Sequence, residues 1–327
     1  MAKVLQVKNL RTCFDTESGT VRAVDGVDLS LEEGETLGIA GESGCGKTVL
    51  ALSIMRLIPS PPGRVASGQV MLDGVDITRL SDEEMRKIRG RGISMIFQEP
   101  MTSLNPVIPV GEQIAEAVRL HLGFSRKDAA CKAVEMLKTV GIPSPSERVK
   151  DYPHQMSGGM RQRVMIAIAL SCRPRLMLAD EPTTALDVTI QAQILDLINR
   201  LKEEAKTSVV LITHDLGVIA EAAQKVAVMY AGLVVEYSSV RELYYEPRHP
   251  YTVGLLESRP GPREKDARDR HLKVIPGTVP NLYELPPGCP FHNRCNVVMD
   301  RCKMERPEYT EISEGHYVRC WRINPWT

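Results

Sequence analysis

The strongest constraint on this chain is an eight-residue string, Gly41-Glu42-Ser43-Gly44-Cys45-Gly46-Lys47-Thr48, which fits the pattern G-x-x-x-x-G-K-[ST] without a mismatch. It follows a short apolar run at 37–40 and opens a helix-forming segment at 47–57. Glycines let backbone N–H groups curl around phosphate oxygens, and a helix N-terminus adds partial positive charge. This order of strand, loop and helix predicts a phosphate-binding loop rather than a simple glycine-rich turn.

Two side chains of this loop suit a nucleoside triphosphate bound with magnesium. Lys47 is expected to reach the β- and γ-phosphates, and Thr48 is expected to ligate Mg²⁺. Cys45 occupies a position that the motif leaves open, where a small filler is enough. The predicted ligands are therefore a nucleoside triphosphate and Mg²⁺.

Two acidic residues follow a later candidate strand. The apolar run at 176–179 ends in Asp180 and Glu181. In a parallel sheet this arrangement puts carboxylates at the carboxyl edge, beside the phosphate loop. Asp180 suits Mg²⁺ binding, directly or through water, and Glu181 suits polarising an attacking water. A merely solvated strand end would be preferred only if the phosphate loop were absent.

Hydrophobic periodicity predicts an α/β fold with a mostly parallel sheet. Segments 4–14 and 24–31 alternate apolar and polar residues, which predicts a small antiparallel N-terminal sheet. Helical spacing at 110–141 predicts a helical subdomain at about 98–172. Strands and helices then alternate, at 160–170 (helix), 176–179 (strand), 190–203 (helix), 209–212 (strand), 216–223 (helix), 226–230 and 233–236 (strands).

Composition excludes several function classes. The 327 residues include 41 basic and 41 acidic side chains, so global charge gives no affinity for nucleic acid, and only a local basic patch would. The first residues have no apolar core of a signal peptide, and the densest apolar run, 164–170, is far shorter than the roughly 20 residues that span a bilayer. We expect a cytosolic chain without a transmembrane helix.

Further motifs match a known family in order and spacing. The segment Met156-Ser157-Gly158-Gly159-Met160-Arg161-Gln162 resembles the signature motif of the ATP-binding cassette (ABC) ATPases. Gln98 matches the Q-loop glutamine, Ala185-Leu186-Asp187 matches the D-loop, His214 matches the switch histidine, and Phe14 stands where an aromatic residue stacks on adenine. The resemblance covers about residues 1–240 and implies the P-loop NTPase fold of an ABC cassette.

The resemblance implies a dimer in which two cassettes enclose two ATP molecules. Each phosphate loop would face Ser157, Gly158 and Gly159 of the partner cassette. His214 would contact the γ-phosphate, and Gln98 would couple Mg²⁺ to a transmembrane subunit. His214 and Gln98 are therefore the predicted catalytic partners of Glu181.

Some positions have alternative interpretations. Met156 and Met160 stand where leucine and glutamine are usual, although the serine and glycines between them are intact. His214 could be a packed histidine at a strand end, and Phe14 could be a core anchor of the N-terminal sheet. Asp187 is assigned to the nucleotide site only through the D-loop match.

The C-terminal part, 246–327, differs in composition from the cassette at 1–245. Segments 248–256, 275–280 and 287–291 are similar to the extension of ATPases from the dipeptide, oligopeptide and nickel importers. The resemblance implies an ATP-hydrolysing subunit that energises uptake of dipeptides or oligopeptides. Its implied partners are a second ABC ATPase subunit in a heterodimer, two transmembrane permease subunits and an extracytoplasmic solute-binding protein, at the cytoplasmic face of the inner membrane.

Three other functions are weighed against this one. The same ATPase could serve nickel or other solutes, because this extension is shared among those importers. The C-terminal extension argues against a second alternative, in which the chain is half of an exporter. A soluble ABC protein of DNA repair or translation usually has a long coiled-coil insertion or two cassettes, whereas this chain has one phosphate loop and about 58 residues between Gln98 and Ser157.

Four of the eight cysteines crowd near the C-terminus. Cys289, Cys295, Cys302 and Cys320 have the spacing C-x5-C-x6-C-x17-C. Four thiolates suit tetrahedral zinc or an iron–sulfur cluster, but the C-x2-4-C knuckle of most structural zinc sites is missing. The peptide-importer resemblance implies a [4Fe–4S] cluster, so the cluster ranks first, zinc second and free thiols third.

Overall fold

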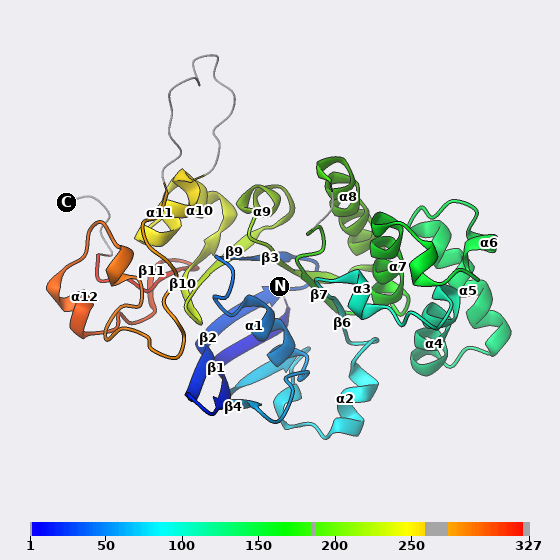
Figure 1. Ribbon diagram of the computed structural model, residues 1–327, viewed down its shortest axis with the longest axis horizontal. Helices are drawn as coiled ribbons and strands as arrows, with labels where there is room; N and C mark the ends of the chain where they lie inside the picture. The colour runs from blue at the N-terminus through cyan, green and yellow to red at the C-terminus, as the bar shows by residue number, and fades with distance from the viewer. Residues whose placement is uncertain (1, 185–186, 259–273, 323–327) are drawn as a thin grey trace, which may run out of the picture. The chain divides into compact units, whose positions relative to one another are not determined.

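The computed structural model describes residues 2–184, 187–258 and 274–322 (Figure 1). Contacts divide the chain into two compact units. The first contains Met1–Gln6, Ser30–Thr36 and Gln69–Ile212, and the second contains Val7–Leu29, Leu37–Gly68 and Thr213–Thr327. The phosphate loop belongs to the second unit and the acidic pair to the first, so each is described within its own unit.

Three parallel strands form the centre of the first unit. They are β8 (Ser208–Ile212), β7 (Leu176–Asp180) and β6 (Ile93–Ile96), in that order. Ile93 pairs with Leu176, which pairs with Ser208. Every residue of β7 and β8 is buried, as expected for strands with both faces covered. Parallel strands in register bring their carboxyl ends to one edge of the sheet.

The helices of the first unit follow the periodicity seen in the sequence. Ser125 caps one helix by accepting from the N–H of Asp128, and Ser81 forms a capping box with Glu84. The helices are α2 (Asp82–Ile88), α3 (Pro100–Ser103), α4 (Val110–Leu122), α5 (Arg126–Thr139), α6 (Pro145–Arg148), η2 (Pro153–Gln155), α7 (Gly158–Leu170) and α8 (Val188–Ala205). Helix α5 contacts α4, α6 and α7, and α4 also contacts α7, so these four helices form one group (Figure 1).

The N-terminal strands form a separate sheet of four strands in the order β2-β1-β4-β5. The strands are β1 (Lys3–Thr16), β2 (Gly19–Glu32), β4 (Gly63–Leu72) and β5 (Val75–Asp76), followed by the short helix η1 (Ile77–Arg79). Only two residues separate β1 from β2, as in a hairpin. This sheet is the predicted N-terminal β subdomain, with two further strands that the alternation pattern did not reveal.

Five strands form the sheet of the second unit, in the order β11-β12-β10-β9-β3. β3 is parallel to β9, whereas the remaining neighbours are antiparallel. The strands are β3 (Thr36–Ala40), β9 (Lys225–Tyr230), β10 (Leu233–Ser239), β11 (Thr310–Ser313) and β12 (His316–Val318). The helices are α1 (Lys47–Ile54), α9 (Leu216–Ala222), α10 (Val240–Tyr245), α11 (Pro250–Glu257), η4 (His292–Arg294) and α12 (Asp300–Met304). The C-terminal extension therefore contributes two strands to this sheet.

An aromatic cluster joins the extension to the strands before it. Tyr230 of β9, Tyr251 of α11 and Phe291 are buried, with ring centroids 4.7–5.4 Å apart. The rings belong to a larger apolar core that includes Val228 and Leu243. The extension thus obtains its core by packing on cassette strands, which fits its Pro-rich composition.

The structure confirms the predicted α/β class, with parallel strands, covering helices and an N-terminal sheet. The helix predicted over 47–57 ends at Ile54, because Met55 caps it and Arg56 adopts a left-handed conformation. No described helix has the length and apolarity needed to span a bilayer. The division at residue 245 stays a prediction.

Candidate functional site

The phosphate loop lies between β3 and α1, as the spacing predicts. Its outer residues Ser43, Gly44 and Thr48 are exposed, whereas Lys47 is only 5% exposed. The ammonium group of Lys47 donates to the carbonyl oxygens of Gly41 (2.7 Å) and Glu42 (3.0 Å). Among the described residues no side chain caps the N-terminus of α1, so its first N–H groups can serve an anion.

Two glycines of the loop are required by close packing. A Cβ on Gly46 would lie 2.2 Å from the carbonyl oxygen of Ala23, and a Cβ on Gly41 would lie 2.3 Å from that of Met229. Both glycines also have positive φ angles, of 103° and 150°. Between them Cys45 is fully buried, and burial raises the pKa of its thiol. Cys45 therefore fits the predicted role of an inert filler.

The acidic pair follows β7 in the first unit. Asp180 is 1% exposed, and Glu181 has a left-handed φ of 45°. The Glu181 carboxylate accepts from Gln98 Nε2 at 3.2 Å and from Thr184 Oγ1 at 2.7 Å. A left-handed non-glycine residue costs about 1–3 kcal/mol and is typical of functional sites. The structure thus brings Gln98 to Glu181 and adds Thr184.

Thr184 is a site residue that sequence reasoning missed. It lies three residues after Glu181, and its N–H donates to the Glu181 carbonyl oxygen at 3.1 Å. The hydroxyl of a threonine in such a turn is placed to reach back to the preceding acid. The Pro182-Thr183-Thr184 sequence directly after the acidic pair is the signal that could have identified it.

The signature segment forms the start of α7. Ser157 caps the helix by accepting from the N–H of Met160 at 3.3 Å. Met156, which stands in a leucine position, is buried, as expected for an apolar side chain there. A Cβ on Gly158 would meet no described atom within 4 Å, whereas one on Gly159 would lie 3.3 Å from a methyl group of Ile190. The packing of this chain therefore does not itself require a glycine at position 158.

The D-loop match is described only in part. Asp187 caps α8 by accepting from the N–H of Ile190 at 2.9 Å. Ala185 and Leu186 lie outside the described residues. Asp187 is exposed, so its carboxylate has a structural bond and access to solvent.

His214 and Phe14 both belong to the second unit. His214 is exposed beyond the end of β8, which does not fit the alternative of a packed histidine. Phe14 is half-buried and lines a groove of about 530 Å³ with Ser43 and Gly44. Residues 279–283 of the extension line the same groove. The structure therefore places the Phe14 ring beside the phosphate loop, and its role in base stacking stays a prediction.

The four C-terminal cysteines line one small cavity of about 20 Å³. Burial raises the pKa of Cys289 to about 11 and that of Cys320 to about 12, and it also raises the pKa of Cys295. The N–H of Cys289 donates to the carbonyl oxygen of Cys302 at 2.8 Å. Within the described ranges, no three His, Cys, Asp or Glu side chains are close enough to hold a metal ion. The structure gathers the four predicted ligands but does not bring them to ligating distance.

Two family models match the chain. Residues 24–184 match the model described as ABC transporter. Residues 235–302 match the one described as oligopeptide/dipeptide transporter, C-terminal region. The two matches cover the phosphate loop, the acidic pair and the first three of the four C-terminal cysteines.

Similar proteins and structures agree with these matches. The chain is 52% identical to the dipeptide transport ATP-binding protein DppD of Bacillus subtilis (strain 168) over 321 residues, which covers 98% of this chain and 95% of DppD. It is 49% identical to the oligopeptide transport ATP-binding protein OppD of the same strain, covering 99% of this chain and 90% of OppD.

A solved structure extends the likeness to three dimensions. The ABC cassette MJ0796, in a dimeric post-hydrolysis state bound to ADP and Pi, superposes with a TM-score of 0.65 at 30% identity. That match covers 72% of this chain and 99% of MJ0796. Because relatives of this similarity match along almost their whole length, the chain belongs to the ABC transporter family and is one of its ATPases.

Proposed function

We propose that this ABC ATPase energises the import of dipeptides or oligopeptides through separate transmembrane subunits. The observation that carries the proposal is the match of residues 235–302 to the C-terminal region of oligopeptide and dipeptide transporters. Relatives about 50% identical over nearly the whole chain, named as dipeptide and oligopeptide transport ATP-binding proteins, support it. This chain supplies the energy, and other subunits contact the peptide.

ATP binding is assigned to the phosphate loop. Lys47 exchanges its bonds to the carbonyl oxygens of Gly41 and Glu42 for the β- and γ-phosphate oxygens. The exposed Thr48 hydroxyl is assigned as a ligand of Mg²⁺. Within the first unit, Asp180 and Gln98 are assigned to Mg²⁺ from their sequence motifs. When bound, Mg²⁺ neutralises charge that develops on the phosphates.

Glu181 is assigned as the general base. The bonds from Thr184 and Gln98 fix the direction of its carboxylate, so it can accept a proton from the attacking water. The exposed imidazole of His214 is assigned to the γ-phosphate. Phe14 is assigned to stacking on adenine, because it lines the groove next to Ser43 and Gly44.

Ser157, Gly158 and Gly159 are assigned to the nucleotide of a second cassette. The N-terminus of α7 presents backbone N–H groups and the Ser157 hydroxyl, which suit an anion. The open space around Gly158 supports a ligand from outside the chain. Asp187 would lie at the same cassette interface.

The second cassette is proposed to be a different ATPase subunit. The test is gel filtration with ATP after Glu181→Gln, which should trap the closed dimer. The heterodimer is supported if this variant dimerises only when the second subunit is added. It loses support if Glu181→Gln alone dimerises as tightly as the mixture.

The remaining partners are two transmembrane permease subunits and an extracytoplasmic solute-binding protein. The chain would then lie peripherally on the cytoplasmic face of the inner membrane. A direct test assembles all subunits and measures ATP hydrolysis. Hydrolysis should be stimulated by the binding protein loaded with a dipeptide or oligopeptide. Stimulation by nickel but not by peptides would contradict the proposed cargo.

The four C-terminal cysteines are proposed to bind a [4Fe–4S] cluster, with zinc as the alternative. Their convergence on one cavity in a segment with little core of its own supports a structural site. Loading requires the thiols to lose protons and to move closer together. Iron and sulfide analysis of anaerobically purified protein tests this proposal, and protein with neither element would rule out the cluster.

A further inference from the structure

Glu42, the second residue of the phosphate loop, is held by two residues from far along the chain. Its backbone N–H donates to the hydroxyl oxygen of Tyr251 at 2.9 Å. Its carboxylate accepts two bonds from the guanidinium group of Arg294, at 2.7 and 3.0 Å. Tyr251 lies in α11 and Arg294 in η4, so both contacts come from the C-terminal extension. All three residues belong to the same compact unit.

Arg294 is itself fixed in place. Its side chain is 4% exposed, and Nε donates to the carbonyl oxygen of Pro276 at 2.9 Å. The guanidinium carbon lies 5.8 Å from the ring centroid of Tyr230 and 5.9 Å from that of Phe291. A planar guanidinium that is packed and doubly bonded to a carboxylate holds its partner in one geometry. Glu42 is therefore attached to a rigid part of the extension.

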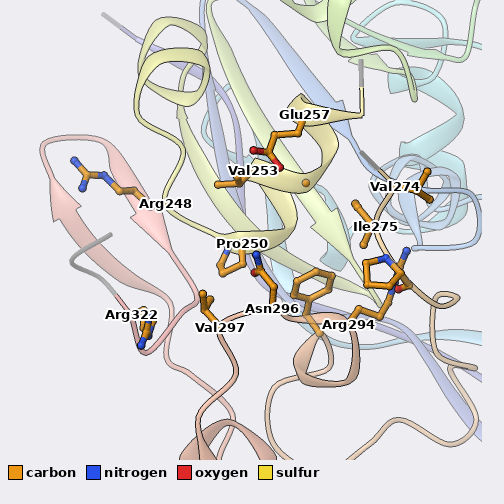
Figure 2. Close-up of a pocket in the computed structure, with 13 residues that line it drawn as sticks. Arg248, Pro250, Val253, Glu257, Val274, Ile275, Arg294, Asn296, Val297 and Arg322 are labelled. Carbon is orange, nitrogen blue, oxygen red and sulfur yellow. The ribbon is translucent and has the colours of Figure 1, made fainter. Parts of the chain in front are cut away.

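A pocket of about 430 Å³ beside Arg294 offers an alternative use for this cation (Figure 2). Arg248 and Arg322 also line the pocket, which would suit an anionic ligand. However, Figure 2 shows these two residues across the pocket from Arg294, so the three cations do not converge. The donors of Arg294 are already bonded to Glu42 and Pro276. The geometry thus favours a role for Arg294 in holding the phosphate loop through Glu42.

The phosphate loop needs such an attachment. Ser43 and Gly44 are exposed, and a Cβ on Gly44 would meet no described atom within 4 Å. Packing therefore does not restrain the outer part of the loop. Lys47 bonds to the carbonyl oxygen of Glu42, the residue that the extension holds. Backbone N–H groups bind phosphate well only when their conformation is set beforehand.

Glu42 also places a negative charge in a loop that binds an anion. The paired Arg294 compensates this charge, since the two groups are in direct bidentate contact. Removing Arg294 alone would leave a carboxylate that repels the phosphates of ATP. Removing both charges would relieve the repulsion. The two substitutions should therefore not have additive effects on ATP binding.

We infer that Arg294 and Tyr251 are positioning residues for ATP binding, through which the C-terminal extension holds Glu42 and with it the phosphate loop. Residues 279–283 of the extension also line the groove that Phe14, Ser43 and Gly44 line, so the extension borders the loop at a second place. The extension is then part of the nucleotide-binding machinery in addition to any role as a four-cysteine site. The inference rests on ATP binding by this loop.

The test compares four variants of the full chain with wild type: Arg294→Met, Tyr251→Phe, the double variant Arg294→Met with Glu42→Gln, and Arg301→Met. The last is a matched control, because Arg301 is an exposed arginine of the same extension that pairs with Glu305. Steady-state hydrolysis gives KM and kcat for Mg-ATP, equilibrium titration with a fluorescent ATP analogue gives Kd, and thermal melting checks folding.

Arg294→Met should raise KM and Kd about tenfold to a hundredfold and change kcat less than about twofold, as expected for loss of a charge-assisted bond used in binding. Tyr251→Phe should raise them about threefold to tenfold, as for loss of a neutral hydrogen bond. The double variant should bind ATP better than Arg294→Met because the repelling charge is gone, but its KM and Kd should stay about threefold to tenfold above wild type because Glu42 is still detached from the extension. Arg301→Met should match wild type.

Unchanged KM and Kd in folded Arg294→Met and Tyr251→Phe would overturn the inference, as would a Glu42→Gln substitution that adds to the defect of Arg294→Met. If Arg294→Met fails to fold, Arg294→Lys keeps the charge without the bidentate guanidinium group and should still raise KM above the wild-type value. A wild-type value for Arg294→Lys would then refute the positioning role. Wild-type protein that binds no ATP would instead refute the function on which the inference rests.

Discussion

Replacing Glu181 with glutamine separates ATP hydrolysis from ATP binding. The substitution keeps the shape of the side chain and one oxygen that can accept from Thr184 Oγ1, now at 2.7 Å. The new amide group cannot accept the proton of the attacking water. The same oxygen accepts from Gln98 Nε2 at 3.2 Å, so the glutamine can keep both bonds and place its NH₂ group at the position of the other oxygen. The change is therefore local and chemical rather than a change of fold.

The expected loss of hydrolysis rate follows from the role of Glu181 as the base. General-base catalysis contributes about 100-fold to 10,000-fold to a rate, which corresponds to about 3–5 kcal/mol of activation free energy. We expect phosphate release to fall at least about 100-fold. ATP affinity should stay within about threefold, since Lys47 and Thr48 are unchanged.

The assay is phosphate release from Mg-ATP, measured beside equilibrium binding of a fluorescent ATP analogue. Glu99→Gln is the matched control, because Glu99 is an exposed acid directly after Gln98 to which we assign no catalytic role. Glu99→Gln should keep the wild-type rate. Retention of more than about a third of the wild-type rate by Glu181→Gln would refute the assignment of the base. So would an equal loss of rate and of ATP affinity.

Three further predictions concern stability, the loop and the cysteines. Glu236→Ala removes the buried acceptor of two backbone N–H groups and an imidazole nitrogen, and should lower Tm by about 5–15 °C; an unchanged melting curve would contradict it. Gly46→Ala puts a Cβ against the carbonyl oxygen of Ala23 and should abolish binding of a fluorescent ATP analogue, whereas Gly34→Ala, with no neighbouring atom, should not. Burial raises the pKa of Cys289 to about 11, so zinc must displace a thiol proton when it binds. The zinc affinity of the metal-free protein should therefore increase as the pH is raised from about 6 to about 8, and an affinity that does not change with pH would argue against thiolate ligation.

Local sequence patterns predicted the parts of the site that depend on short-range geometry. The phosphate loop was predictable because its glycine positions meet fixed steric demands, such as the 2.2 Å approach at Gly46. Ser157 was predictable as a helix cap because it directly precedes Gly158 and Gly159 at the start of a helical segment. The edge position of Glu181 followed from the apolar strand before it. In each case the determining neighbours lie within a few residues.

Contacts between distant residues were not predictable in this way. Glu42 occupies an open position of the motif, and its partner Arg294 is 252 residues away. Neither residue is part of a periodic pattern, so no local rule pairs their charges. The left-handed conformation of Glu181 also depends on tertiary contacts, including its N–H bond to the carbonyl oxygen of Ile212. Such features require the folded structure.

The cysteines illustrate both cases. Their clustering in the sequence predicted that Cys289, Cys295, Cys302 and Cys320 act together, and in the structure all four line one cavity. Spacing alone did not determine which ligand they hold. Chemical analysis for iron, sulfide and zinc is needed because several metals accept thiolates.

The central claim is that ATP hydrolysis by this chain drives the uptake of peptides. The most direct measurement is uptake of a labelled dipeptide by proteoliposomes that contain the permease subunits, with the solute-binding protein, this chain and ATP supplied on their respective sides. Uptake should require ATP and should be abolished when Glu181→Gln replaces the wild-type chain. Equal peptide accumulation with wild type and Glu181→Gln, or accumulation without ATP, would contradict the account.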